Sequence, residues 1–227
     1  MTRGKLIAIG LLLPVLASGA ESARQELARA LALTPDAQRG SELFAQCASC
    51  HGAGGEGVMA GTTPRIAGQH YGVLVRQLVD FRRGKRWDFQ MEGVATSHDV
   101  IPELQDVADV AAYVSQLSRD GVRGIGDGQF LEQGAKIYEE ACASCHGPAG
   151  EGNDARAIPR IAGQHAGYLS RQMYDAVDGR RPQLTRTHRA RLAKLEFTDV
   201  RGLADHIARM GTSGQEAPAN AGSPPTH

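Results

Sequence analysis

The sequence is short of aromatic residues and cysteines, and it has no excess charge of either sign. Only 5% of its 227 residues are Phe, Trp or Tyr, and four are Cys. Lys and Arg number 25, as do Asp and Glu, so the formal net charge is zero. A neutral chain gives no support for nucleic-acid binding, which needs a strongly basic face. With so few aromatic side chains, a large apolar group must help to complete the core.

Long apolar runs are also missing, except at the N-terminus. Residues 1–20 combine Arg3 and Lys5, an apolar stretch from Leu6 to Leu16, and small residues that end at Ala20. This order is typical of a secretory signal peptide, so we expect cleavage near Ala20 and export. The stretch is short for a bilayer-spanning helix, and retention as an anchor is the alternative. We therefore expect membrane association only through partner proteins.

All four cysteines lie in two copies of one pentapeptide. The string Cys-Ala-Ser-Cys-His occurs at residues 47–51 and again, 95 residues later, at 142–146. In haem attachment, the two thiols bind the vinyl groups and the histidine can take one axial position of the iron. A thioredoxin-type redox pair or a four-cysteine zinc site leaves both histidines unexplained. The sequence predicts two covalent haem c groups, attached through Cys47, Cys50, His51, Cys142, Cys145 and His146.

The repeat extends well beyond the two pentapeptides. Residues 64–70 and 159–165 are the identical string Pro-Arg-Ile-Ala-Gly-Gln-His. In each copy, apolar residues at helical spacing mark a helix ending in the haem motif, a helix after the Gly-Gln-His string, and a third helix beginning near Asp106 or Asp199. No stretch alternates between apolar and polar residues with a period of two, so strands are not indicated and we expect an all-α fold. Internal repetition on this scale indicates two similar domains.

Composition suggests where the domains end. Glycines and charged residues at 119–128 indicate a linker, and the small residues and prolines of 211–227 indicate a disordered tail. The expected segments are a signal peptide (1–20), an N-terminal extension (21–35), domain 1 (36–118), the linker (119–128), domain 2 (129–210) and the tail (211–227).

Over roughly residues 36–210, the attachment motif followed by Pro-x-Ile-Ala-Gly-Gln resembles the cytochrome c4 family. This resemblance implies two tandem class I cytochrome c domains related by a pseudo-twofold axis, a periplasmic location and single-electron transfer. It also implies that the carbonyls of Pro64 and Pro159 accept hydrogen bonds from the haem-ligating histidines, which orients their rings. The implied partners are redox proteins, namely a dehydrogenase or quinol-oxidising complex and a terminal oxidase or reductase, and no small-molecule substrate is expected.

In that family, the sixth iron ligand is a methionine before the third helix. Met91, which begins the string Met-Glu-Gly-Val-Ala, has this pattern, although the segment that follows is longer than in the family and contains His98, the alternative ligand. Domain 2 has no methionine between Tyr174 and Ala208. His188 lies at the family's spacing from the third helix, so we predict that it binds the second iron. The competing interpretation is a solvated histidine in an arginine-rich loop.

These assignments predict an electron carrier that is not an enzyme. One alternative is the cytochrome subunit of a specific dehydrogenase complex. Another is a haem enzyme in which the second haem lacks a strong sixth ligand and binds a substrate. Residues 180–194 contain six cationic side chains and no acid. Such a segment either steers an acidic redox partner or is a solvated loop, and the sequence leaves both possibilities open.

Overall fold

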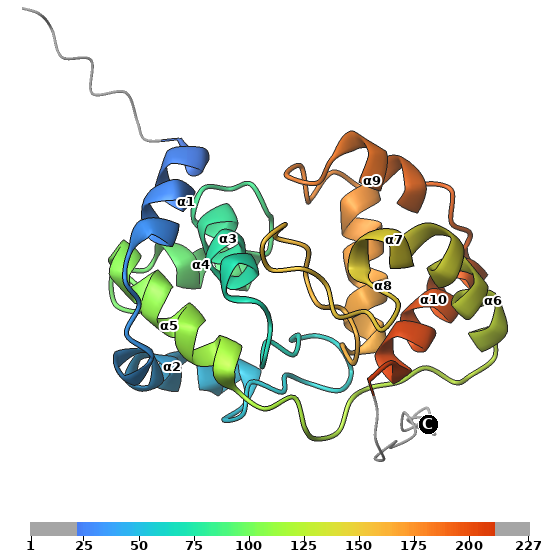
Figure 1. Ribbon diagram of the computed structural model, residues 1–227, viewed down its shortest axis with the longest axis horizontal. Coiled ribbons are helices and arrows are strands. Elements are labelled where there is room, and N and C mark those ends of the chain that lie inside the picture. The colour runs from blue at the N-terminus through green and yellow to red at the C-terminus, as the bar shows by residue number, and fades with distance from the viewer. Residues whose placement is uncertain (1–21, 212–227) are drawn as a thin grey trace, which may run out of the picture.

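The computed structural model describes residues 22–211, which form helices joined by loops (Figure 1). The only β-pairing within this range is an isolated bridge between Asn153 and Ile158, so the expected all-α fold is confirmed. The signal peptide and all but the first residue of the expected tail lie outside the described residues. Between residues 22 and 211, no helix is long and apolar enough to cross a bilayer.

The helices form two groups (Figure 1), and residues 117–130 connect them without a helix. The first group is α1 (Ala23–Ala32), α2 (Ala37–His51), α3 (Tyr71–Arg82), α4 (Phe89–Thr96) and α5 (Leu104–Gln116). The second is α6 (Leu131–Ile137), the π-helix η1 (Tyr138–Cys142), α7 (Ala143–His146), α8 (Ala166–Val177), α9 (Arg186–Leu192) and α10 (Phe197–Arg209). We call these groups the first and second halves.

The third main helix of each half begins two residues before the expected position. α5 begins at Leu104 and α10 at Phe197, whereas the sequence pattern suggested Asp106 and Asp199. Each aspartate is the third residue of its helix and accepts a hydrogen bond from the N–H of the N-cap residue, which is Glu103 in α5 (2.8 Å) and Glu196 in α10 (2.9 Å). These reciprocal caps stabilise the helix start and explain the shift.

In each half, the first and third helices cross at a glycine. A Cβ atom on Gly40 would overlap with the carbonyl of Asp109 in α5, and one on Gly134 would overlap with that of Gly202 in α10. Beside the first crossing, Phe44 packs on Tyr113 with ring centroids 5.3 Å apart. Only the absence of a side chain allows backbones to approach this closely.

The second half contains one extra residue in its first helix, and η1 absorbs it. Seven positions separate Gly40 from Cys47, but eight separate Gly134 from Cys142. The π-helix of residues 138–142 lies within this interval, whereas α2 is α-helical throughout. A π-turn holds one residue more than an α-turn, so an insertion can be accommodated without rotating the helix that follows. Both haem motifs therefore keep the same relation to their crossing glycine.

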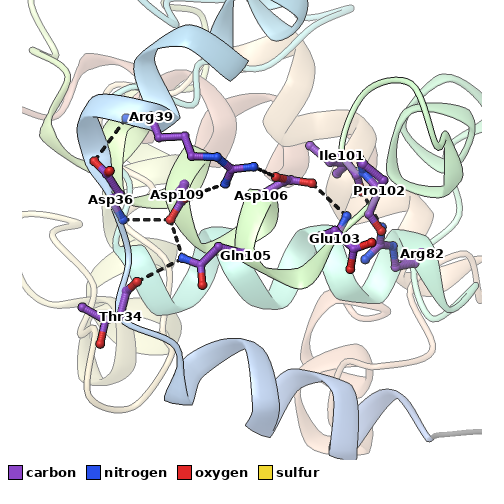
Figure 2. Close-up of polar contacts among 10 residues, drawn as sticks. All are labelled: Thr34, Asp36, Arg39, Arg82, Ile101, Pro102, Glu103, Gln105, Asp106 and Asp109. Carbon is purple, nitrogen blue, oxygen red and sulfur yellow. Dashed lines mark hydrogen bonds and ion pairs between the residues drawn. The ribbon is translucent and has the colours of Figure 1, made fainter.

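In each half, a buried aspartate on the third helix binds the backbone of the segment that leads into the first helix. In the first half, Asp109, 1% exposed, accepts hydrogen bonds from the backbone N–H of Asp36 and from Nε2 of Gln105, both at 2.7 Å (Figure 2). Arg39 of α2 pairs with both Asp106 and Asp109 (Figure 2). In the second half, Asp205 accepts from the N–H groups of residues 126 and 128 at 2.8 Å each.

Helix α1 belongs to the first half alone and was not foreseen from the sequence. Its capping box joins Ser22 and Gln25. Its inner face places Leu27 and Ala30 in the core cluster formed with α3 and α5. Its buried Glu26 forms ion pairs with arginines at the end of α3. The apolar core of the first half thus includes one helix that has no counterpart in the second half.

Two glutamines join the halves through reciprocal hydrogen bonds. Gln164 accepts from the N–H of Arg65 (2.9 Å) and donates to its carbonyl (2.7 Å). Gln69 makes the same pair with Arg160, at 2.9 and 2.8 Å. Both residue pairs are related by the offset of 95, so exchanging the halves exchanges the contacts. The expected pseudo-twofold relation is confirmed.

Two histidines repeat this reciprocity. Nε2 of His70 lies 2.8 Å from the carbonyl oxygen of Glu151, and Nε2 of His165 lies 2.8 Å from that of Glu56. Each histidine thereby bonds to the loop that follows the haem motif of the other half. Hydrogen bonds from side chains to backbone carbonyls, and not side-chain packing alone, thus connect the two haem motifs across the interface.

Candidate functional site

The haem motif of the first half forms the last turn of α2. His51 is 6% exposed, and its Nδ1 lies 3.0 Å from the carbonyl oxygen of Pro64. Burial lowers the pKa of His51, and the hydrogen bond to Pro64 opposes part of that shift. A neutral imidazole that donates through Nδ1 has a free lone pair on Nε2, which is the form that binds a metal.

The second motif repeats this geometry. Nδ1 of His146 lies 3.1 Å from the carbonyl oxygen of Pro159. Burial also lowers the pKa of His146, again with the proline carbonyl opposing it. The contacts between each proline and histidine are those that the resemblance implied. Both halves thus present a histidine whose ring is fixed by the same backbone acceptor.

The cysteines lie in separate pairs along the two helices. Cys47 and Cys142 are half-buried, whereas Cys50 and Cys145 are exposed. Between residues 22 and 211, no group of three or more His, Cys, Asp or Glu side chains is placed to hold a metal ion. A shared four-cysteine zinc site is therefore inconsistent with this arrangement.

A cavity of about 290 Å³ extends from the first motif to the interface between the halves. Its lining includes His51, both cysteines of the first motif and Met91. Apolar side chains of α3 and α5 form most of the remaining wall on the side of the first half. His98 is exposed and does not line the cavity. The structure thus brings Met91, and not His98, to the same cavity as His51.

Met91 and His188 occupy equivalent positions on two short helices. Met91 is the third residue of α4, and its N–H donates to the N-cap carboxylate of Asp88 (3.1 Å). His188 is the third residue of α9, and its N–H donates to the N-cap hydroxyl of Thr185 (3.1 Å). The sequence does not predict either helix, because helices this short give weak periodicity. The N-cap residues just before them were the available signal.

His188 faces the haem-motif histidine of its own half. The ring centroids of His146 and His188 are 6.3 Å apart. Two imidazoles that bind one metal ion from opposite sides have centroids about 6 Å apart, because each metal–nitrogen bond is about 2 Å and each nitrogen lies about 1 Å from the centre of its ring. Burial lowers the pKa of His188, and His146 and nearby arginines lower it further. The ring is half-buried, which does not fit a fully solvated residue.

The cavity also carries positive charge at the interface. Arg65 and Arg160 line it, as do Arg86 and Arg181, and each pair is related by the offset of 95. The Nε atoms of Arg65, Arg160 and Arg181 are buried without a hydrogen-bond partner among the described residues. An apolar macrocycle with two carboxylates matches both the apolar wall and these unsatisfied donors. The residues present therefore fit a haem with its propionates.

Arg86 and Arg181 were not identified from the sequence, although their 95-residue offset could have shown them. Arg86 donates to Gln172 of the second half at 2.7 Å and also to Tyr168. Burial lowers the pKa of Arg181 to about 10, and the neighbouring Arg86 adds to this. Arg82 was also missed. It donates from Nε to the carbonyl of Ala95 (2.9 Å) and so ties α4, with Met91, to α3.

Comparison with known proteins agrees with this geometry. The Cytochrome c family profile matches residues 37–118 and 131–210. Cytochrome c4 of Pseudomonas aeruginosa is 35% identical over 180 residues, covering 76% of this chain and 87% of that protein. The thiosulfate dehydrogenase electron acceptor of Stutzerimonas stutzeri (strain A1501) is 30% identical over 171 residues, covering 73% and 79%. The crystal structure of reduced recombinant cytochrome c4 from Pseudomonas stutzeri superimposes with a TM-score of 0.69 at 31% identity, covering 78% of this chain and all of the other.

The two attachment motifs fall one in each matched region, and the match to cytochrome c4 of Pseudomonas aeruginosa covers three quarters of this chain. The chain is a member of the cytochrome c4 family, an electron-transfer protein with one haem c covalently attached in each half.

Proposed function

We propose that this protein is a periplasmic electron carrier with two different iron sites. Its first half binds iron through His51 and Met91, and its second half through His146 and His188. The observation that carries the proposal is the separation of 6.3 Å between the rings of His146 and His188, which suits one metal ion between them. The equivalent positions of Met91 and His188 on α4 and α9 support the same assignment.

When bound, each haem iron supplies reversible one-electron oxidation. The protein's part is to tune and shield that chemistry. The thioether of Met91 favours the ferrous state and raises the reduction potential, whereas the imidazole of His188 favours the ferric state and lowers it. Pro64 and Pro159 fix the proximal rings equally in both halves, so the two potentials differ mainly because of the sixth ligands. Electrons then pass from the half that contains His188 to the half that contains Met91.

A strong imidazole ligand in the second half also bears on the competing enzyme hypothesis. An iron that binds peroxide or a sulfur compound needs an open or weakly held sixth position. His188 fills that position in this proposal, so the second haem is closed to small molecules. The protein acts as a carrier, and its partners are other redox proteins.

As a second candidate function, the protein is the cytochrome subunit of one specific dehydrogenase complex. It is favoured by the relative that is named as the electron acceptor of thiosulfate dehydrogenase, 30% identical to this chain. Co-purification with a larger catalytic chain under native conditions distinguishes a dedicated subunit from a free carrier. A free carrier elutes alone.

The ligand assignments are tested by low-temperature electron paramagnetic resonance of the ferric protein, together with its near-infrared sulfur-to-iron band. We expect two low-spin signals and a near-infrared band from one haem. Met91→Ala removes the band. His188→Ala converts one haem to a high-spin form, which binds carbon monoxide when reduced. His98→Ala is the matched control, because His98 is exposed and should leave both haems unchanged.

Three results would contradict the proposal. A near-infrared band that survives in Met91→Ala shows that another sulfur ligand is present. Two unchanged low-spin haems in His188→Ala show that His188 is not a ligand. Rapid binding of carbon monoxide by the reduced wild-type protein shows that one haem is open and favours the enzyme hypothesis.

A further inference from the structure

The segment between the second and third helices differs in charge between the halves. In the first half, residues 84–102 contain two cationic and three acidic side chains. In the second half, the equivalent residues 179–195 contain six cationic side chains and no acidic one. Since the whole chain is formally neutral, this positive charge is concentrated locally rather than spread over the protein.

Three of the six cations are exposed and have no acidic partner in the described chain. Arg181 lines the internal cavity, and Arg180 pairs with Asp175 at 2.8 Å. Arg189 is half-buried and donates to the carbonyl of Pro182 (3.2 Å). The remaining side chains are exposed and have no carboxylate within ion-pair distance among residues 22–211: Arg186, Arg191 and Lys194. We call these three residues the α9 cationic face.

The α9 cationic face lies beside the second haem motif. It is on or just after the same helix as His188. Nη1 of Arg191 donates to the carbonyl of Ala141, the residue before Cys142, at 3.2 Å. A protein bound on this face would therefore approach the attachment edge of the second haem.

We infer that the α9 cationic face is the docking site of an acidic electron-donor protein. Opposite charge increases the rate of encounter, and local positive potential orients the partner toward the nearest redox centre. That the partner is a donor rather than an acceptor rests on the proposed function, in which His188 gives the second half the lower potential and makes it the point of electron entry.

An anionic membrane surface is the rival occupant, and the structure does not favour it. Interfacial membrane binding combines cations with apolar side chains that enter the lipid. Two large exposed apolar side chains lie near the segment: Trp87 contacts Arg180, and Phe197 follows Lys194 by three residues. No such side chain lies within residues 179–195, where six cations are concentrated, so charge is the dominant feature of the face and suits an acidic protein better than a bilayer.

The test uses the holoprotein and a reduced acidic flavodoxin as the electron-donor probe. The bimolecular rate constant of haem reduction is measured against ionic strength for the wild type and two double variants. Arg186→Glu with Lys194→Glu reverses two charges on the face. Arg24→Glu with Lys136→Glu makes the same change in net charge on the exposed surfaces of α1 and α6. Glutamate at residue 186 suits the first turn of α9, so the helix should persist.

We expect the wild-type rate constant to fall as salt is added. The variant of the α9 cationic face should react about tenfold more slowly at low ionic strength, with a weaker dependence on salt. The control variant should stay within about twofold of the wild type, because neither Arg24 on α1 nor Lys136 on α6 belongs to the α9 cationic face.

Equal slowing of both variants, or a wild-type rate that does not fall with salt, would overturn the inference. Salt-sensitive binding of the wild type to phosphatidylglycerol vesicles that the α9 variant loses would assign the face to membranes instead. Failure of the ligand assignment is visible separately, because it appears in the wild-type spectra and not in the rate constants. First reduction of the haem in the first half would overturn the donor role alone.

Discussion

The two halves of this cytochrome c4 family member share one framework but differ in the segment before the third helix. The proline that accepts from the haem-motif histidine, the crossing glycine and the reciprocal interface contacts occur in both. Residues 84–102 and 179–195 differ in length and charge, and in the residue that we propose as sixth ligand, Met91 in one and His188 in the other. The framework that holds the haem is thus separable from the segment that tunes it.

The comparison also shows how the framework tolerates change. One inserted residue in the first helix of the second half is taken up by η1, and the motif after it keeps its position. The first half gains α1, which adds Ala30 to its core, whereas nothing equivalent covers the second half within residues 22–211. We therefore expect the second half to depend more on its haem.

The largest effect should come from removing one attachment motif. Replacing Cys142 and Cys145 by alanine should abolish covalent haem in the second half and unfold much of it, because that core then lacks its largest apolar group. Replacing Cys47 and Cys50 should also remove one haem but cost less helical signal, since α1 still covers the first half. Intact mass and far-ultraviolet circular dichroism measure both. A larger helical loss in the first-half variant would refute the difference in dependence.

Exchanging the sixth ligands should reverse the order of the two potentials. In the double variant Met91→His, His188→Met, the first half becomes the low-potential site. Each potential should move by on the order of 0.1 V, a fraction of the ~0.8 V span that axial ligands cover. Spectroelectrochemical titration measures the potentials, and the near-infrared band should persist because one thioether remains. An unchanged order of potentials would show that the protein surroundings, rather than the ligands, set the asymmetry.

Much of the framework could be predicted because the repeat displays it twice. The attachment residues and the all-α fold follow from short motifs whose chemistry is local. Gln69 and Gln164 were visible as repeated residues, but their partners were not, because pairing between the halves is a tertiary property. The structure of the segment before each third helix was harder to predict, since α4 and α9 have only eight and seven residues and show little periodicity.

Helix α1 and the π-helix η1 could also have been predicted from the sequence. The Ser22 and Gln25 pair is a capping box at the start of α1. The seven-residue spacing from Gly40 to Cys47 against eight from Gly134 to Cys142 indicated the π-helix. Both could have been found by comparing the halves residue by residue. The positions of the buried aspartates, by contrast, depend on long-range contacts that no local pattern encodes.

The crossing glycines should be the most sensitive backbone positions. Gly40→Ala and Gly134→Ala place a methyl group against a carbonyl of the third helix, so each should lower the free energy of unfolding by about 3 kcal/mol. Gly93→Ala in α4 is the matched control, because no atom lies within 4 Å of its added Cβ. That control should be neutral or stabilising by up to about 1 kcal/mol. Denaturant unfolding of the holoprotein measures all three, and equal effects would contradict the close crossing.

Deleting the extra residue of the second half should be better tolerated than deleting its counterpart in the first. Removal of Glu140 restores the seven-residue spacing and should turn η1 into α-helix at a change of less than about 1 kcal/mol, with both haems attached. Removal of Gln46 from α2 should rotate its haem motif away from Gly40 and weaken the first haem site. Haem content per chain and thermal unfolding distinguish the outcomes. Loss of the second haem on deleting Glu140 would show that the π-turn itself is required.

The smallest expected change in melting temperature comes from two aspartates that are equivalent in the repeat but have different surroundings. Asp175 pairs with Arg180 at 2.8 Å, whereas Oδ2 of Asp80 is buried without a hydrogen-bond partner in the described chain. Burial raises the pKa of Asp80, and Arg76 and other nearby cations oppose only part of this.

A raised folded pKa means that folding favours protonated Asp80. Its contribution to stability is therefore present below the unfolded pKa of about 3.9 and is lost as the pH rises through the folded value. Asp80→Asn mimics the neutral form, so it should raise the melting temperature by about 1 °C at pH 8 and leave it unchanged near pH 4. Asp175→Asn should instead lower it slightly at pH 8, because it loses a half-exposed ion pair. Identical responses of the two variants would show that burial alone, rather than pairing, governs both sites.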